Sequence, residues 1–376
     1  AWWGGMLVAV GLSSGILGVL FALAQHDLKR LLAYHSVENI GIIALGLGIG
    51  LLGLSAGIPV VAALGFAGAL LHVVNHAVFK GLLFLGAGSV LHAAGTGEID
   101  HLGGLLKRMP RTGLTFLVGA AAIAGLPPLN GFVSEYLLFL GSFRGAASSA
   151  AGLSVPLIGA LAGLALISGL AAACFAKAFG IVFLGEPRSR HAAHAHEPGR
   201  AMRVPQWILA GACAAIGLCA PVALRAVLPA AHVAMGGPSA EDLADIAPGL
   251  GGVTVSFAIA FALAGILALL RRRLLSGRSV EEAVTWDCGY AAPTARMQYT
   301  ASSFAQPLTD LFRLVLRTRR SLTAPRGSFP EPGALSTVTP DLCTENLYRP
   351  LFVGIERGLG SLRRLQHGNL HLYVLY

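Results

Sequence analysis

The chain has 376 residues, of which 55% are hydrophobic and 12% charged, with a mean hydropathy of +0.70 and a formal net charge of +9. A soluble domain carries roughly a quarter charged residues, so this composition excludes an ordinary water-soluble protein. The basic residues fall in short loops between apolar runs, which favours topology signals over nucleic-acid binding. Five cysteines without a CxxC pair indicate neither an iron–sulfur cluster nor a zinc site.

Seven apolar runs are long enough to cross a bilayer, which takes about 20 residues. Glycine, with 49 residues, is frequent within them, and in lipid this composition favours close helix packing. The sequence therefore predicts an all-α, polytopic membrane protein with about seven transmembrane helices. The expected runs cover residues 4–24, 32–55, 60–93, 113–143, 153–184, 207–228 and 252–270.

The distribution of positive charge predicts the topology. If each run crosses once, one side of the membrane holds a large group of basic residues, and the positive-inside rule makes that side cytoplasmic. Dividing the long run at 60–93 into two crossings would spoil this segregation, so a single crossing is expected there. The basic group consists of Lys29, Arg30, Lys107, Arg108, Arg111, Arg188, Arg190, Arg200, Arg203, Arg271, Arg272, Arg273 and Arg278.

The composition changes after about residue 271, where the chain becomes basic and rich in Ser, Thr and Pro. We expect residues 273–368 to form a cytoplasmic basic segment with short helices, which serves either as a partner surface or as a solvated linker. Residues 369–376 read as the start of a truncated terminal helix, and the chain begins at Ala1 without Met. We therefore expect an internal fragment of a longer protein.

Ionisable residues inside the apolar runs are the candidate functional residues, because each costs at least ~2.5–3.5 kcal/mol at mid-bilayer on insertion scales. His72, His76 and Lys80 in HVVNHAVFK are four residues apart, which places them along one helix face. Imidazole titrates near neutral pH, so the three groups predict a proton wire. A set of interhelical hydrogen bonds is the alternative.

A second candidate site lies in AIAGLPPLNGFVSEYLLF. Pro127 and Pro128 break the helix and Gly125 loosens it further. Broken helices in membranes leave backbone groups that must face protein or a water-filled cavity, and transporters place sites at them. Glu135 follows the break within the span and is assigned to the pathway, with an interfacial carboxylate as the alternative.

A third candidate site lies in AQHDLKRLLAYHSVENIG. Lys29 stands at the boundary between two spans, and His35 and Glu38 lie deeper in the second one. The spacing of three residues allows His35 and Glu38 to pair on a helix. We assign all three to the predicted pathway, although Lys29 also contributes to topology.

No cofactor or metal is expected on this chain. His191, His194 and His196 resemble a metal cluster by their number, but they lie in a basic loop without another obvious ligand, which favours a solvated loop. The sequence contains no Gly-rich phosphate loop, Ser/His/Asp constellation or dinucleotide fingerprint, so no catalytic residue is assigned.

The motifs together resemble the antiporter-like membrane subunits of complex I, Mrp antiporters and group 4 membrane hydrogenases. QHDLKRLLAYHSVENIG, HVVNHAVFKGLLFLGAG, GGLLKRMP and GLPPLNGFVSEYLLF stand in the usual order of that family. A narrower resemblance, to the antiporter-like membrane subunits of hydrogenase-4 and formate hydrogenlyase, rests on SVENIG, FLGEPRS, TWDCGYAAPTARMQYTASSFAQP and RRLQHGNLHLYVLY.

The resemblance implies two inverted repeats of five helices, each with a broken helix and a charged half-channel. Residues 1–184 would be the second repeat and residues 185–272 additional transmembrane helices. The family roles that carry over are Lys80 as the central switch lysine, His72 and His76 as its relay, Glu135 as the terminal charge, and Lys29 as the lysine of the DLKR motif. Several family members have Lys in place of Glu135, so the sign of that charge varies.

The resemblance also implies a proton-translocating subunit of a redox-driven respiratory or hydrogenase complex, with no redox centre on this chain. Its partners would be other antiporter-like and membrane-arm subunits, together with hydrogenase or quinone-module subunits. It would reside in the cytoplasmic (inner) membrane of a bacterium or archaeon and move protons or Na⁺. The alternatives are an Mrp-type Na⁺/H⁺ antiporter subunit and a non-pumping membrane anchor of a hydrogenase complex.

Overall fold

A computed structural model describes residues 1–148, 152–237, 246–279, 294–295, 297–325, 327, 333–360, 362, 368 and 371. Contacts within the chain define a large unit, Ala1–Pro307, and a small unit, Leu308–Tyr376. The sequence instead suggests boundaries after residues 184, 272 and 368, from its composition and its resemblance to a repeat family. That division stays a prediction. The expected helix start at 369–376 lies almost wholly outside the described residues.

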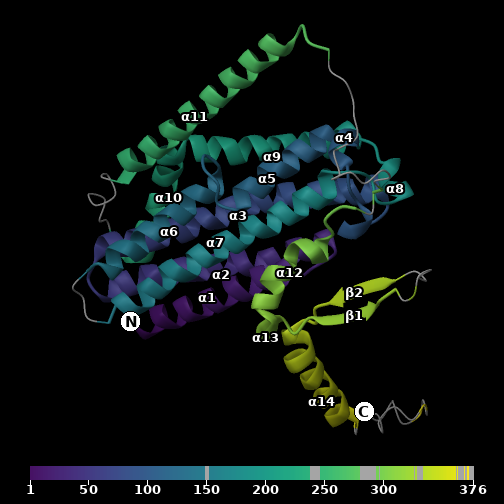
Figure 1. Cartoon of the computed structure of the whole chain (residues 1–376). Coiled ribbons are helices and arrows are strands. Elements are labelled where there is room, and N and C mark those ends of the chain that lie inside the picture. Colours follow the sequence, from purple (N-terminus) through teal and green to yellow (C-terminus); the bar gives the residue numbers. More distant parts are fainter. Residues whose placement is uncertain are drawn as a thin grey trace. The chain divides into compact units, whose positions relative to one another are not determined.

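The large unit is a bundle of long helices with short connections (Figure 1). Six helices in the described ranges are long and apolar enough to cross a membrane: α1, α2, α3, α7, α9 and α11. In order, the elements are α1 (Trp2–Leu23), α2 (Leu28–Ser55), α3 (Pro59–Ala94), the 3-10 turn η1 (Ile99–His101), α4 (Leu105–Arg108), α5 (Pro110–Ile123), α6 (Asn130–Ala146), α7 (Ser154–Phe183), α8 (Arg190–Ala193), α9 (Arg200–Leu218), α10 (Ala220–Met235), α11 (Ile246–Leu275) and the start of α12 (Ala301–Leu311).

The expected run at 113–143 is divided between two helices, neither of which is among the six candidate spans. Helix α5 ends at Ile123 and α6 begins at Asn130, so the interruption falls where the two prolines predicted it. The run at 60–93 is one uninterrupted helix, α3, as expected. The polytopic all-α architecture predicted from the sequence is therefore confirmed.

The expected single run at 207–228 is wrong, because two helices share it. Helix α9 ends at Leu218 and α10 begins at Ala220. Pro221 has no backbone N–H, so it cannot continue the hydrogen-bond ladder of α9 toward the carbonyl of Gly217. At the same point an added methyl group on Gly217 would lie 1.8 Å from the Pro128 carbonyl oxygen. The end of α9 thus packs directly on the break between α5 and α6.

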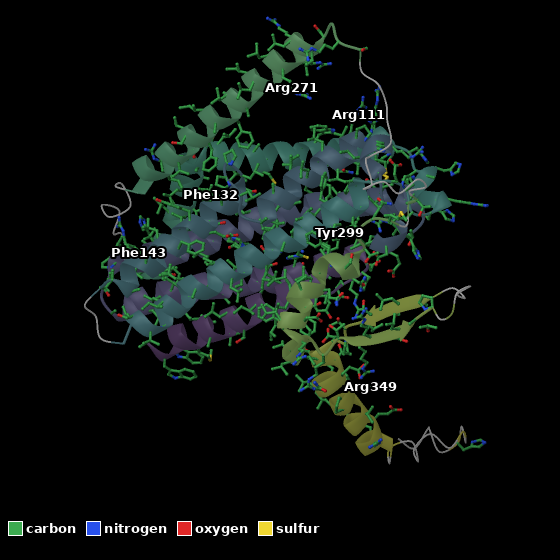
Figure 2. The ribbon with its side chains drawn as sticks, in the orientation of Figure 1. Arg111, Phe132, Phe143, Arg271, Tyr299 and Arg349 are labelled. Carbon is green, nitrogen blue, oxygen red and sulfur yellow. The ribbon has the colours of Figure 1, made fainter. Side chains whose placement is uncertain are left out.

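Basic loops gather at one end of the bundle. Helices α4 and α8, which carry basic residues, lie at the end opposite the N-terminus (Figure 1). Arg111 and Arg271 lie toward that same end, whereas Phe143 lies at the other (Figure 2). This arrangement matches the segregation of charge predicted from single crossings.

Glycines bring α1 and α2 into backbone contact. A methyl group added to Gly41 of α2 would lie 2.5 Å from the nitrogen of Gly15 and 2.6 Å from the carbonyl oxygen of Gly11, both on α1. One added to Gly18 would lie 2.5 Å from the backbone nitrogen of Glu38. The expected role of glycine in close packing is confirmed at this interface, which holds the backbone of Glu38 against α1.

Polar side chains fasten the broken helix to its neighbours at the basic end. Glu197 accepts hydrogen bonds from the backbone N–H groups of Arg111 (2.8 Å) and Thr112 (3.1 Å), so it caps the start of α5. Deeper in the bundle, Gln206 of α9 bonds to Thr115 of α5 at 2.9 Å and to Ser89 of α3 at 2.7 Å. These contacts hold α5 between α3 and α9.

The small unit contains the end of α12, α13 (Arg313–Leu316), an antiparallel hairpin, the π-helical turn η3 (Thr344–Tyr348) and α14 (Arg349–Leu359). The hairpin pairs β1 (Arg319–Thr323) with β2 (Ala334–Val338) in the register Arg319–Val338 to Thr323–Ala334. All five residues of β1 and four of the five in β2 are exposed. The hairpin therefore buries little apolar surface.

The glycine interface predicts a sharp response to one methyl group. Gly41→Ala should lower the thermal stability of the detergent-solubilised protein, because overpacking of a close interface costs ~1–3 kcal/mol. Gly169→Ala on α7 is the matched control: nothing lies within 4 Å of its added methyl group. The control should be neutral or stabilising, since alanine is the better helix former by ~0.5–1 kcal/mol. Equal melting temperatures for the two variants would contradict the interface.

The sidedness of the bundle predicts opposite accessibility for two arginine positions. In a cysteine-free background, Arg190→Cys in α8 and Arg144→Cys near the end of α6 should react with an impermeant maleimide from opposite sides of sealed vesicles. Both side chains are exposed and separated by the single crossing of α7. Labelling of both positions from the same side would rule out that crossing.

Candidate functional site

A row of polar side chains crosses the interior of the bundle. Its members are at most 5% exposed and come from four helices, which makes them expensive to bury without partners. They are His35, Glu38 and Asn39 on α2; His72, Asn75 and Lys80 on α3; Asn130, Ser134 and Glu135 on α6; and Lys177 on α7.

The centre of the row is the pair His35–Glu38. The Nδ1 atom of His35 contacts the carboxylate of Glu38 one turn further along α2, as their spacing predicts. Asn39 donates to the carbonyl of His35 at 2.7 Å. From α3, Lys80 donates to the carbonyl of Leu32 on α2. The ammonium group of Lys80 thus reaches the same turns of α2 that carry the pair.

His72 joins three helices. Its Nε2 lies 3.0 Å from Asn39 Oδ1 on α2, and its Nδ1 lies 2.9 Å from Ser134 Oγ on α6. Asn75 donates to Ser134 at 2.9 Å and to the carbonyl of Asn130 at 2.7 Å. The imidazole therefore belongs to a hydrogen-bonded network that ties α2 and α3 to the start of α6.

The expected His72–His76–Lys80 ladder is only partly reproduced. His76 is half-buried, and its ring lies 5.8 Å from that of Phe79. In the part of the chain that the structure describes, no hydrogen bond joins the three groups to one another. The side chains share a helix, but His72 and Lys80 make their hydrogen bonds to other helices. Their position along one face is as predicted, while their role in a wire stays a prediction.

Glu135 lies at the helix break. Its carboxylate accepts a hydrogen bond of 2.8 Å from Ser168 of α7. Gly125, in the break, has a left-handed φ of +65°, and a methyl group there would lie 2.7 Å from Glu135 Oε2. The break thus provides the space in which the carboxylate sits. Glu135 is buried and does not face bulk solvent, while its assignment to the pathway stays a prediction.

The ends of the row are linked electrostatically through Glu38. Its charge acts on Lys80 of α3, and it also acts on Glu135 of α6. Lys80 and Glu135, on two different helices, thus each lie within interaction range of Glu38 in a medium of low dielectric constant. A change of charge on Glu38 alters the energy of charge on both of them.

Lys29 does not lie in this row. It is exposed at the first turn of α2, next to Asp27, which caps the helix by accepting from the N–H of Arg30 at 2.8 Å. The buried lysine that the sequence analysis missed is Lys177, which is 1% exposed. It stands alone in the apolar run at 153–184, and the criterion of an ionisable residue inside a span would have identified it.

The remaining histidines show no metal centre. Within the described ranges, no group of three or more His, Cys, Asp or Glu side chains is arranged to hold a metal ion. His191, His194 and His196 are exposed around the short helix α8. The Nδ1 atom of His194 lies 2.8 Å from the carbonyl oxygen of Arg190.

Residues 1–159 match the family model of the NADH:quinone oxidoreductase and Mrp antiporter transmembrane region. The chain belongs to this antiporter-like family. Hydrogenase-4 component B of Escherichia coli (strain K12) is 37% identical over 388 residues, covering 100% of this chain and 57% of the relative. Formate hydrogenlyase subunit 3 of the same strain is 38% identical over 330 residues, covering 85% and 52%.

The fold of this antiporter-like chain also resembles a solved structure. A chain of the membrane-bound sulfane sulfur reductase, an archaeal respiratory membrane complex, superimposes with a TM-score of 0.69 at 22% identity. The alignment covers 99% of this chain and 54% of that one. The chain thus spans a little over half the length of the proteins it matches.

The contact between Gly125 and Glu135 predicts a coupling that a double-mutant cycle can measure. Gly125→Ala adds both backbone strain and a clash with the carboxylate, whereas Gly95→Ala, at φ +64° with nothing within 4 Å, adds strain alone. The strain costs ~1–2 kcal/mol, so Gly125→Ala should lose more thermal stability than the control. Glu135→Ala should recover the excess in the double variant. Additive losses would show that the two residues do not touch.

Proposed function

We propose that this chain is part of a proton-translocating subunit of a redox-driven membrane complex of the hydrogenase-4, formate hydrogenlyase or NADH-quinone oxidoreductase type. The observation that carries the proposal is the buried polar row from Lys80 through His35–Glu38 to Glu135 at the helix break. Ionisable groups this deep in a membrane bundle are costly, and transport pathways are their commonest use.

Protons can move along this row by transfer between neighbouring ionisable side chains. Redox chemistry elsewhere in the complex would change the field at the row. When the Lys80 ammonium group releases a proton toward the His35–Glu38 pair, the loss of positive charge raises the energy of negative charge on Glu38. Proton uptake by Glu38 relieves that cost, and a subsequent transfer to Glu135 brings the proton to the broken helix.

Unpaired atoms support a hydrated path. Within the described part of the chain, His35 Nε2, Asn75 Oδ1, His76 Nε2 and Asn130 Oδ1 are buried without a hydrogen-bond partner. Buried polar atoms of this kind are normally satisfied by ordered water. Three of the four belong to α3 and to the start of α6, which follows the break. Water at these atoms would bridge His76 to the network around His72.

The partners and setting follow from the same reasoning. The chain covers just over half of its curated relatives, so the row is one segment of a longer pathway that neighbouring helices complete. Other antiporter-like and membrane-arm subunits, together with hydrogenase or quinone-module subunits, would supply the redox chemistry, since the proposal places no redox cofactor on this chain. The basic end of the bundle would face the cytoplasm of a bacterium or archaeon.

Removal of the central lysine should uncouple transport from redox turnover. In the full-length subunit within its complex, Lys80→Ala should lower the number of protons moved per electron at least about tenfold, because a positioned proton-transfer group contributes ~10²–10⁴-fold. Glu135→Gln should have the same direction of effect, and Glu135→Asp should retain part of the transport. The measurement is dye-detected acidification of sealed vesicles, normalised to redox turnover.

Lys107→Gln is the matched control for these variants. Lys107 is a 65% exposed lysine paired with Glu186 at the basic end, so its loss should leave transport unchanged. If the assembled complexes with Lys80→Ala and Glu135→Gln still transport protons fully, this chain does not carry the protons. That outcome would favour its role as a non-pumping anchor. Transport driven by Na⁺ gradients without redox turnover would favour the Mrp-type antiporter instead.

A further inference from the structure

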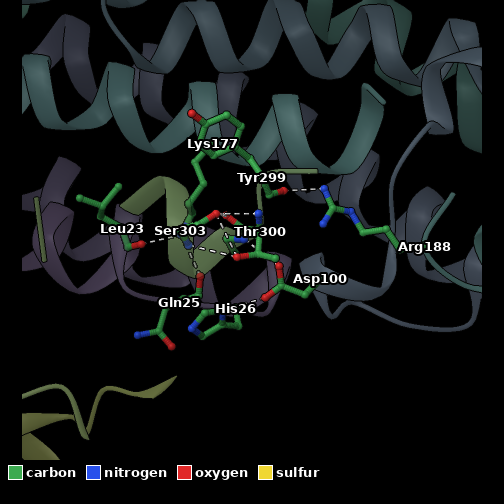
Figure 3. Close-up of polar contacts among 10 residues, drawn as sticks. Leu23, Gln25, His26, Asp100, Lys177, Arg188, Tyr299, Thr300 and Ser303 are labelled. Atoms are coloured by element: carbon green, nitrogen blue, oxygen red, sulfur yellow. Dashed lines mark hydrogen bonds and ion pairs between the residues drawn. The ribbon is translucent and has the colours of Figure 1, made fainter. Parts of the chain in front are cut away.

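Lys177 is the lysine of the buried row to which the proposed path from Lys80 to Glu135 gives no role. It lies on α7, nine residues beyond Ser168 and therefore about 13 Å further toward the basic end of the bundle. Its ammonium group donates to the carbonyl oxygens of Leu23 at 2.5 Å and Gln25 at 2.9 Å, where α1 ends (Figure 3). These carbonyls belong to the negative end of the α1 dipole, which favours a cation there.

A capping role alone does not account for the charges around Lys177. Toward the interior, the ring of Phe175, two residues before Lys177 on α7, lies 4.6 Å from the ring of His35. The charge of Lys177 acts on this imidazole, as does that of Lys80. Toward the surface, it interacts with Asp100 in the loop after α3. Lys177 thus lies between the central pair of the row and a carboxylate at the basic end.

The surface end of this line is the pair His26–Asp100. His26 follows directly after Gln25, and its Nδ1 lies 3.2 Å from Asp100 Oδ2. The side chains are 26% and 33% exposed, so the pair is open to water. Burial would raise the pKa of the Asp100 carboxyl, but hydrogen bonds from His26 and from the N–H of Ala301 outweigh it and lower the pKa, which keeps the carboxylate charged.

A later part of the chain contacts the pair at Asp100. Asp100 Oδ1 accepts from the N–H of Ala301 at 2.7 Å, at the start of α12. Arg188 donates to the carbonyl of Tyr299 at 2.6 Å, and Thr300 and Ser303 bond to each other at the same turn (Figure 3). These contacts hold residues 299–303 over the loops at the basic end.

We propose that Lys177 is a proton-transfer residue that links the His35–Glu38 pair to the His26–Asp100 pair. The inference rests on the proposed function and assigns a residue to its connection with the basic side. The Lys177 ammonium group gives its proton to the His35–Glu38 pair and becomes a neutral amine. It regains a proton from the bulk solution at the basic side, relayed by water past the His26–Asp100 pair. Each relaying water accepts one proton and gives one up, so both transfers conserve charge. Water has to bridge the stretch between Gln25 and His26–Asp100.

Substitution by arginine separates this role from capping. Lys177→Arg keeps the positive charge and the donors for the two carbonyls, but an arginine does not release its proton. Lys177→Gln keeps a donor without the charge. Both variants, in the full-length subunit within its complex, should assemble and turn over, and both should move roughly tenfold fewer protons per electron. Full transport by an assembled Lys177→Arg complex would show that Lys177 only caps α1 and would overturn the proposal.

Two further variants keep the test decisive. If Lys177→Arg fails to assemble, Asp100→Asn at the exposed end replaces it as the test. Reduced proton transport at normal redox turnover supports the route, and unchanged transport overturns it. Lys80→Ala is measured in parallel. A defect in Lys80→Ala without one in the Lys177 and Asp100 variants rejects this inference alone, while transport in all of them rejects the proposed function as well.

Discussion

The structure depends on the cost of burying charge among apolar helices. Five ionisable side chains are at most 5% exposed: His35, Glu38, Lys80, Glu135 and Lys177. A buried charge is tolerated only where another polar group interacts with it. His35 and Glu38 contact each other along one helix. Lys80 and Lys177 each donate to backbone carbonyls of another segment, and Glu135 accepts from Ser168 of α7. The bundle is therefore organised around polar contacts between helices as much as around its apolar surface.

Two packing devices serve this requirement in different ways. The glycines at the α1–α2 interface remove side chains, so that the backbone at Gly18 lies directly against Glu38. The break between α5 and α6 creates room for the Glu135 carboxylate beside Gly125 and directs it toward Ser168. The first device brings the backbone of α1 against one side of the row. The second leaves backbone groups at the break, which in a membrane need protein or water as partners.

Family membership and geometry support the function at different levels. The matches to hydrogenase-4 component B and formate hydrogenlyase subunit 3 cover just over half of those proteins. They therefore support a role for one part of a longer subunit. The geometry shows what that part contributes: a central histidine–glutamate pair within range of two lysines and a second carboxylate. The short connection toward Asp100 gives this part its own approach to the basic end.

The sequence by itself determined most of the spans, the gathering of the basic loops at one end, the break at the prolines and the His35–Glu38 contact. These follow from hydropathy, charge and spacing within one helix. Only the tertiary structure decided which helices supply the polar partners of each buried ionisable side chain. His72 bonds to α2 and α6 rather than to its own helix, and Lys29 faces outward despite its motif. Lys177 is a single charge in an apolar run. Its hydrogen-bond acceptors lie at the end of α1, more than 150 residues earlier. Periodicity reports which side chains share a face, whereas their partners depend on packing between distant segments.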